Sequence, residues 1–189
     1  MWRWFFMAAV EAAQGVRLPG TWDGFEVAIR AIVSELQTES ASEILAALTR
    51  AYGRRVPAPP SSGPEWLFPS RTALRSLDSG DLSSGAVERI RALAGAVLNG
   101  AIRFDPTSTY AQLVERLVWV GGLSASRAAW VAMRTLGEPD APLLDGNASA
   151  VWRPWRSYVA LVQLAGLDEI SRGFRSAGRH DLQIVQHGS

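Results

Sequence analysis

The chain has 189 residues, of which 48% are hydrophobic, and this is enough for one domain with a sizeable core. Its 19 basic residues are all arginine, and 18 acidic residues nearly balance them, so the net charge is only +1. This excludes a strong attraction of the whole molecule to nucleic acid, and any binding face has to be local. Without cysteine there is no disulfide framework and no thiolate-bound iron–sulfur cluster, and without lysine no side-chain amine can form a Schiff base.

The first predicted element is a short helix over residues 2–14. Residues 1–10 (MWRWFFMAAV) are apolar, but Arg3 and Glu11 bracket a run much shorter than the roughly 20 residues of a spanning helix. No small-residue cleavage site follows this run. We therefore expect an amphipathic helix that packs on the domain of a cytoplasmic protein, with anchoring at a membrane surface as the alternative.

Helices are also predicted for the middle of the chain. Asp23 or Thr21 can cap a helix with an apolar face that ends at Leu36, and Ser40 with Glu43 forms a capping box for the next. Proline in residues 56–64 (VPAPPSSGP) predicts a surface loop without regular structure. Further helices are predicted over residues 70–77, 85–98, 109–120 and 152–165.

The expected fold class is therefore all-α, with one helical domain over residues 1–167. Residues 168–189 lose the apolar periodicity, so they are predicted to form an irregular C-terminal tail. The tail contains both histidines, His180 and His187, and we expect a frayed end there rather than a metal site.

A turn with paired glycines joins two helical runs within residues 117–137 (LVWVGGLSASRAAWVAMRTLG). The turn is Gly121-Gly122-Leu123-Ser124, and the apolar spacing on both sides is helical. A turn of this kind exposes backbone N–H groups at a helix start, where the helix dipole favours a phosphate without reading any base. The alternative is an ordinary corner between two packed helices.

Four blocks of the chain resemble the helix–hairpin–helix DNA glycosylase superfamily, and within it the DNA-3-methyladenine glycosylase II branch. They occur in the family's order and at nearly its spacing. The blocks are residues 17–32 (RLPGTWDGFEVAIRAI), 67–77 (LFPSRTALRSL), 120–139 (ending in WVAMRTLGEP) and 152–161 (WRPWRSYVAL). The resemblance implies a truncated or divergent helical domain that bends double-stranded DNA, flips a damaged nucleotide and hydrolyses its N-glycosidic bond. Lacking lysine, such an enzyme would be monofunctional.

The resemblance places the catalytic aspartate shortly after the second hairpin helix. An ungapped match puts it on Gly146, whereas a one-residue deletion puts it on Asp145, which we prefer. A carboxylate there would stabilise the oxocarbenium-like sugar and orient water. The alternative is that Asp145 belongs to an ordinary Asp-Gly-Asn turn. Between Gly146 and Trp152 the chain also lacks roughly 16 residues that relatives have, about four helical turns.

The hairpin itself departs from the family's usual Pro-Gly-(Ile/Val)-Gly. Ser124 replaces a glycine, and Ser126 stands where the family often has an aromatic residue for the base pocket. Arg127 follows the hairpin and could meet a phosphate, or it could be a surface arginine with no such role. We expect DNA contacts from Gly121, Gly122, Leu123, Ser124, Ser126 and Arg127.

Two further residues are candidates for the base pocket and for the wedge that fills the vacated stack. Trp130 matches a frequently aromatic position and could stack on a cationic alkylated purine, with packing between helices as the alternative. Leu36 falls in the turn where relatives place the wedge, although it also continues the apolar stripe of its helix, which favours core packing.

The expected function is thus a monofunctional glycosylase for alkylated bases in base excision repair. The alternatives are a non-catalytic module that binds DNA or senses lesions, and a truncated remnant. The expected partner is double-stranded DNA, with no membrane and a monomeric state. No cofactor or metal is expected, except that the resemblance allows a monovalent cation on the hairpin's backbone carbonyls.

Overall fold

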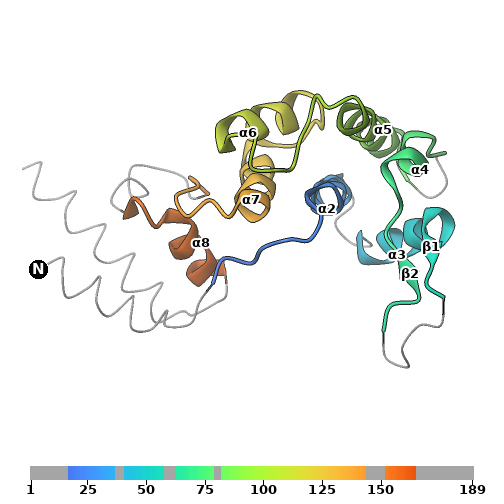
Figure 1. The fold of residues 1–189 in the computed structure, drawn as a ribbon, viewed down its shortest axis with the longest axis horizontal. Helices are drawn as coiled ribbons and strands as arrows, with labels where there is room; N and C mark the ends of the chain where they lie inside the picture. Colours follow the sequence, from blue (N-terminus) through green and yellow to red (C-terminus); the bar gives the residue numbers. More distant parts are fainter. Residues whose placement is uncertain (1–16, 37–40, 58–62, 79–81, 144–151, 165–189) are drawn as a thin grey trace, which may run out of the picture. The chain divides into compact units, whose positions relative to one another are not determined.

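A computed structural model describes residues 17–36, 41–57, 63–78, 82–143 and 152–164 (Figure 1). Its elements are α2 (Gly24–Leu36), α3 (Ala41–Tyr52), β1 (Arg54–Arg55), β2 (Trp66–Leu67), α4 (Arg71–Arg75), α5 (Ser84–Leu98), α6 (Tyr110–Trp119), α7 (Ala125–Leu136) and α8 (Arg156–Leu164). This confirms the predicted all-α class, apart from one two-stranded ribbon.

The chain divides into two compact units. One unit is Gly20–Leu136, and the other contains the described residues 17–19, 137–143 and 152–164. The predicted helix over residues 2–14 and the predicted tail over residues 168–189 lie outside the described residues, so the predicted domain boundary at residue 167 stays a prediction. No helix in the described ranges is long and apolar enough to cross a membrane.

The central helix of the Gly20–Leu136 unit is α2. It begins where predicted, because the Asp23 carboxylate accepts the Phe25 N–H at 2.9 Å and so caps the first turn. Its apolar face is buried from Phe25 to Val33, and α2 packs against α3, α5 and α7 (Figure 1). The largest side chains of the core that it organises are Phe25, Ile29, Ile32, Leu74, Leu77, Ile90, Leu93, Ile102, Leu113 and Leu117.

The ribbon of β1 and β2 was not expected, and it flanks the proline-rich loop. The two strands pair antiparallel, with Arg54 opposite Leu67 and Arg55 opposite Trp66, and the Val56 N–H donates to the Glu65 carbonyl at 2.8 Å. Two residues per strand are too few for alternating hydrophobicity to reveal them. Of the predicted capping box, Ser40 lies outside the described residues.

The helices from α4 to α6 begin at hydroxyl caps. The Ser70 and Ser83 side chains accept the Ala73 and Ala86 N–H groups, at 3.2 and 3.3 Å. Thr109 forms a capping box with Gln112, which was not predicted from the sequence, and this starts the first helix of the hairpin.

The last helix begins later than predicted. The sequence favours a helix from residue 152, but α8 starts at Arg156, after a turn in which the Trp155 N–H donates to the Trp152 carbonyl at 2.6 Å. Proline disfavours the helical region for the residue before it, so Pro154 keeps Arg153 out of the helix.

Candidate functional site

The predicted helix–hairpin–helix is present between α6 and α7. The Val120 N–H ends α6 by donating to the Arg116 carbonyl at 2.9 Å, and the Leu123 N–H reaches back to the Leu117 carbonyl at 3.3 Å. Leu123 is buried, so it anchors the turn in the core. The Ser124 carbonyl then accepts the Ala128 N–H at 2.9 Å, which starts α7.

Both glycines are required by this geometry. A Cβ on Gly121 would lie 2.7 Å from the Leu117 carbonyl oxygen, closer than backbone atoms tolerate. Gly122 has φ +63°, a left-handed conformation that glycine adopts without strain. A Cβ on Gly122 would also lie 3.0 Å from Nε and 3.1 Å from Cδ of Arg89, so this α5 side chain lies against the turn.

The Ser124 N–H, at the start of α7, is already bound to a carboxylate. It donates to Glu35 Oε1 at 3.1 Å and to Oε2 at 3.3 Å. Glu35 lies in the last turn of α2, so this contact joins the hairpin to the end of the central helix. The amide that was expected to be available to a phosphate therefore has an acidic partner within the protein. Glu35 was not predicted as a site residue, because no local pattern reports a contact 89 residues away.

The predicted contact residues after the turn are exposed. Ser126 Oγ lies 3.4 Å from Ser124 Oγ, on the first turn of α7. Arg127 forms no hydrogen bond or ion pair with any described residue and points from the same turn. Trp119, the last residue of α6, is 81% exposed beside the hairpin.

Leu36 is the last residue of α2 rather than part of a turn. Leu36 is 36% exposed and does not belong to the buried core cluster, and its role as a wedge stays a prediction. Because Glu35 precedes Leu36 directly, the contact of Glu35 with Ser124 also places the end of α2 beside the hairpin.

Trp130 lies on α7 and is half-buried rather than part of the core cluster. The Arg134 guanidinium lies 5.9 Å from the centre of its ring, in a cation–π contact. Arg134 also donates to the Gly20 carbonyl at 3.3 Å, which holds its side chain over the indole. The stacking role of Trp130 stays a prediction.

Asp145 lies outside the described residues, but the segment leading to it is tightly bound. Arg156 donates to both carboxylate oxygens of Asp140, at 2.7 and 2.9 Å, and to the Asp140 carbonyl at 2.6 Å. Arg153 adds a contact at 3.0 Å. The hydrogen bond from Arg156, assisted by that from Arg153, holds the pKa of the Asp140 carboxyl below its usual value although burial opposes this.

Ser157, which is fully buried, adds to the contacts of Asp140 with Arg153 and Arg156, and together these contacts form an anchor for the segment after α7. Its hydroxyl donates to the Glu138 carbonyl at 2.7 Å and accepts the Ala141 N–H at 3.0 Å, and its own N–H donates to the Pro139 carbonyl at 3.0 Å. The start of α8 thus fixes residues 138–141. The sequence block WRPWRSYVAL contains Arg153, Arg156 and Ser157, but only the fold shows that they bind the segment after α7.

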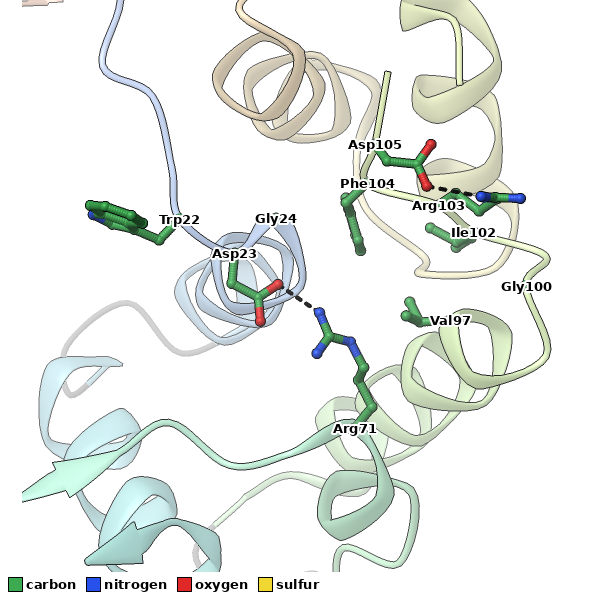
Figure 2. A pocket seen from close by; sticks show the side chains of 10 residues that line it. All are labelled: Trp22, Asp23, Gly24, Arg71, Val97, Gly100, Ile102, Arg103, Phe104 and Asp105. Atoms are coloured by element: carbon green, nitrogen blue, oxygen red, sulfur yellow. Dashed lines mark hydrogen bonds and ion pairs between the residues drawn. The ribbon is translucent and has the colours of Figure 1, made fainter. Parts of the chain in front are cut away.

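An open cleft of about 500 Å³ lies at the other end of α2 (Figure 2). Figure 2 shows Arg71 reaching to Asp23, at 2.9 Å, and Arg103 paired with Asp105, at 3.1 Å, so each basic group in the cleft has an acidic partner. At a rise of about 1.5 Å per residue, the two ends of the 13-residue helix from Gly24 to Leu36 lie about 18 Å apart. The predicted site residues do not line this cleft.

The described residues contain no group of three or more His, Asp or Glu side chains that could hold a metal ion. The predicted site residues thus fall into two sets. The hairpin, Trp130 and Leu36 belong to the Gly20–Leu136 unit, and Asp145 follows the anchored segment of the other unit.

No protein-family model matches the chain. The chain is 31% identical over 175 residues to the probable bifunctional transcriptional activator/DNA repair enzyme AlkA of Mycobacterium tuberculosis (strain CDC 1551 / Oshkosh), covering 80% of this chain and 35% of that protein. It is 29% identical over 173 residues to DNA-3-methyladenine glycosylase 2 of Escherichia coli (strain K12), covering 79% of this chain and 60% of that protein. The chain thus spans about a third of the length of the first relative and 60% of the length of the second.

The fold is also that of a solved structure. Clostridium acetobutylicum 8-oxoguanine glycosylase/lyase, in complex with double-stranded DNA that contains cytosine opposite 8-oxoG, matches with a TM-score of 0.58 and 14% identity, over 93% of this chain and 67% of that one. The curated relatives and the fold confirm the resemblance that the four sequence blocks indicated. That resemblance is to the helix–hairpin–helix DNA glycosylase superfamily, within its DNA-3-methyladenine glycosylase II branch.

Proposed function

We propose that this protein is a monofunctional DNA glycosylase that removes alkylated bases in base excision repair. The observation that carries the proposal is the hairpin, in which two obligatory glycines present the start of α7 on the surface, in a chain similar to a DNA-3-methyladenine glycosylase. The partner is double-stranded DNA, as in the similar solved structure. The protein acts as a cytoplasmic monomer without a cofactor, and a monovalent cation on the hairpin carbonyls is compatible with this proposal.

In this proposal each predicted residue has a separate task. The turn from Gly121 to Ser124, with Ser126 and Arg127, holds the DNA backbone without reading its sequence. Leu36, exposed at the end of α2, fills the gap that the flipped nucleotide leaves. Trp130 stacks on the extruded base, whose positive charge favours an aromatic face.

Asp145 is the proposed catalytic carboxylate. Departure of an alkylated base leaves positive charge on the sugar, and an ionised carboxylate beside the anomeric carbon stabilises that charge and orients the attacking water. With no lysine in the chain, no Schiff base follows and the backbone is not cleaved. The anchor of Asp140 to Arg156 and Ser157 supports this role, because it fixes the chain a few residues before Asp145.

Release of free base from methylated duplex DNA tests the proposal. We expect release by the wild type, none by Asp145→Asn, and wild-type release by Asp78→Asn, a matched variant because the Asp78 side chain is 90% exposed and belongs to the other unit. Equal release by Asp145→Asn would show that another group is the carboxylate. A folded wild type that binds DNA but releases no base would favour a non-catalytic lesion sensor.

A further inference from the structure

The two sides of the hairpin carry opposite charges, and neither was expected from the sequence. Glu35 from α2 holds the Ser124 N–H, and Arg89 from α5 lies against Gly122. Within the described residues Arg89 has no hydrogen bond or ion pair, and its side chain is half-buried. Any role of these two charges in holding a DNA phosphate rests on the proposed function.

The carboxylate weakens the hairpin as a phosphate site. The Val120, Leu123 and Ser124 N–H groups all donate within the protein, and the Ser124 acceptor is an anion. A negative charge at the start of α7 offsets the partial positive charge that a helix N-terminus supplies. A phosphate at the same place would therefore meet a like charge.

Arg89 can supply the positive charge that the Glu35 carboxylate offsets. Its Nε and Cδ lie where a Cβ on residue 122 would need room, so its stem is packed on the turn and its guanidinium starts from a defined position. A guanidinium is permanently charged and donates to phosphate through two parallel N–H groups. We propose that Arg89 binds a backbone phosphate of the DNA on the Gly122 side of the hairpin, and so compensates for the carboxylate of Glu35 on the Ser124 side.

Equilibrium binding of the full chain to an undamaged duplex, at a series of salt concentrations, tests this proposal. Arg89→Gln is expected to lower the slope of log K against log salt by about 0.9, and to weaken binding roughly tenfold near 0.1 M salt, because one counterion is no longer released. Arg89→Lys should keep the slope, since the charge remains. Arg50→Gln is the matched control, because Arg50 is an exposed arginine on α3, a helix that packs against α2 and β2.

The Glu35→Gln variant is expected to change the affinity for the duplex in the opposite direction. Glutamine keeps an acceptor for the Ser124 N–H but removes the charge, so binding should tighten roughly twofold to fivefold. The variant with both Arg89→Gln and Glu35→Gln should return towards wild-type affinity while its slope stays lowered. Unchanged melting temperatures would show that these effects do not arise from unfolding.

A slope for Arg89→Gln equal to that for Arg50→Gln would overturn the inference while leaving the proposed function intact. A wild type that binds no duplex would overturn the proposed function and the inference together. These two results are distinguishable in one titration series, because the wild type is measured alongside each variant.

Discussion

Replacement of Asp140 by asparagine is expected to loosen the segment that leads to Asp145. Arg156 donates to the Asp140 carboxylate at 2.7 and 2.9 Å, and only 15% of each of these two side chains is exposed. Arg153 donates to the same carboxylate at 3.0 Å, but its own side chain is 67% exposed. The two arginines therefore contribute unequally to the stability of this unit.

These exposures set the size of the effect. Removing one partner of a buried ion pair costs about 3–5 kcal/mol, whereas an exposed pair contributes about 0–1 kcal/mol. Because asparagine keeps one oxygen as an acceptor, we expect roughly 2–3 kcal/mol for local opening in Asp140→Asn. The matched variant Arg153→Gln should cost less than about 1 kcal/mol.

Amide hydrogen exchange at Ala141 and Ser157 measures this local opening, because both N–H groups are bonded inside the anchor. The lowered pKa of Asp140 means that its contribution is fully present above the ordinary value near 4, and is lost as the pH falls through the lower value of the folded state. The difference between wild type and Asp140→Asn should be constant from about pH 5 to 8 and shrink below about pH 4. Unchanged exchange at neutral pH, or a difference that grows in acid, would refute a stabilising role for the Asp140 carboxylate.

Four further substitutions test the hairpin, the fold and the proposed wedge. Gly122→Ala should destabilise by about 1–2 kcal/mol in denaturant unfolding because of its positive φ, whereas Gly95→Ala, in the interior of α5 with nothing within 4 Å, should stabilise by about 0.5–1 kcal/mol. Ile32→Ala should cost about 2–5 kcal/mol in the same measurement, since Ile32 is fully buried, and a cost below about 1 kcal/mol would contradict its place in the core. Leu36→Ala should change stability by less than about 1 kcal/mol, yet reduce the preference for abasic over intact duplex in competition binding; an unchanged preference would argue against the wedge.

Local signals were sufficient for most of the helices. Asp23 caps α2 as predicted, and the glycine pair marks the turn between α6 and α7, because caps and turns depend on residues close in sequence. The ribbon of β1 and β2 escaped prediction, because strands of two residues have no period to detect.

The electrostatic surroundings of the hairpin could not be predicted in the same way. Glu35 reaches Ser124, and Arg89 reaches Gly122, only after α2, α5 and the hairpin have packed together. In the sequence both residues look like ordinary charges on the polar face of a helix. For Leu36, the apolar spacing favoured packing in the core, whereas the structure places this residue, 36% exposed, at the end of α2.

The ion pair between Asp140 and Arg153 joins the two ends of the connection between them. For a flexible connection, closure entropy grows only as the logarithm of the number of residues, so lengthening a loop of about 13 residues by roughly 16 costs only about 0.7 kcal/mol. The shorter connection that the resemblance implies for this chain is therefore expected to be nearly neutral for closing this loop. Folding of this unit therefore places little constraint on the number of residues between Asp140 and Arg153.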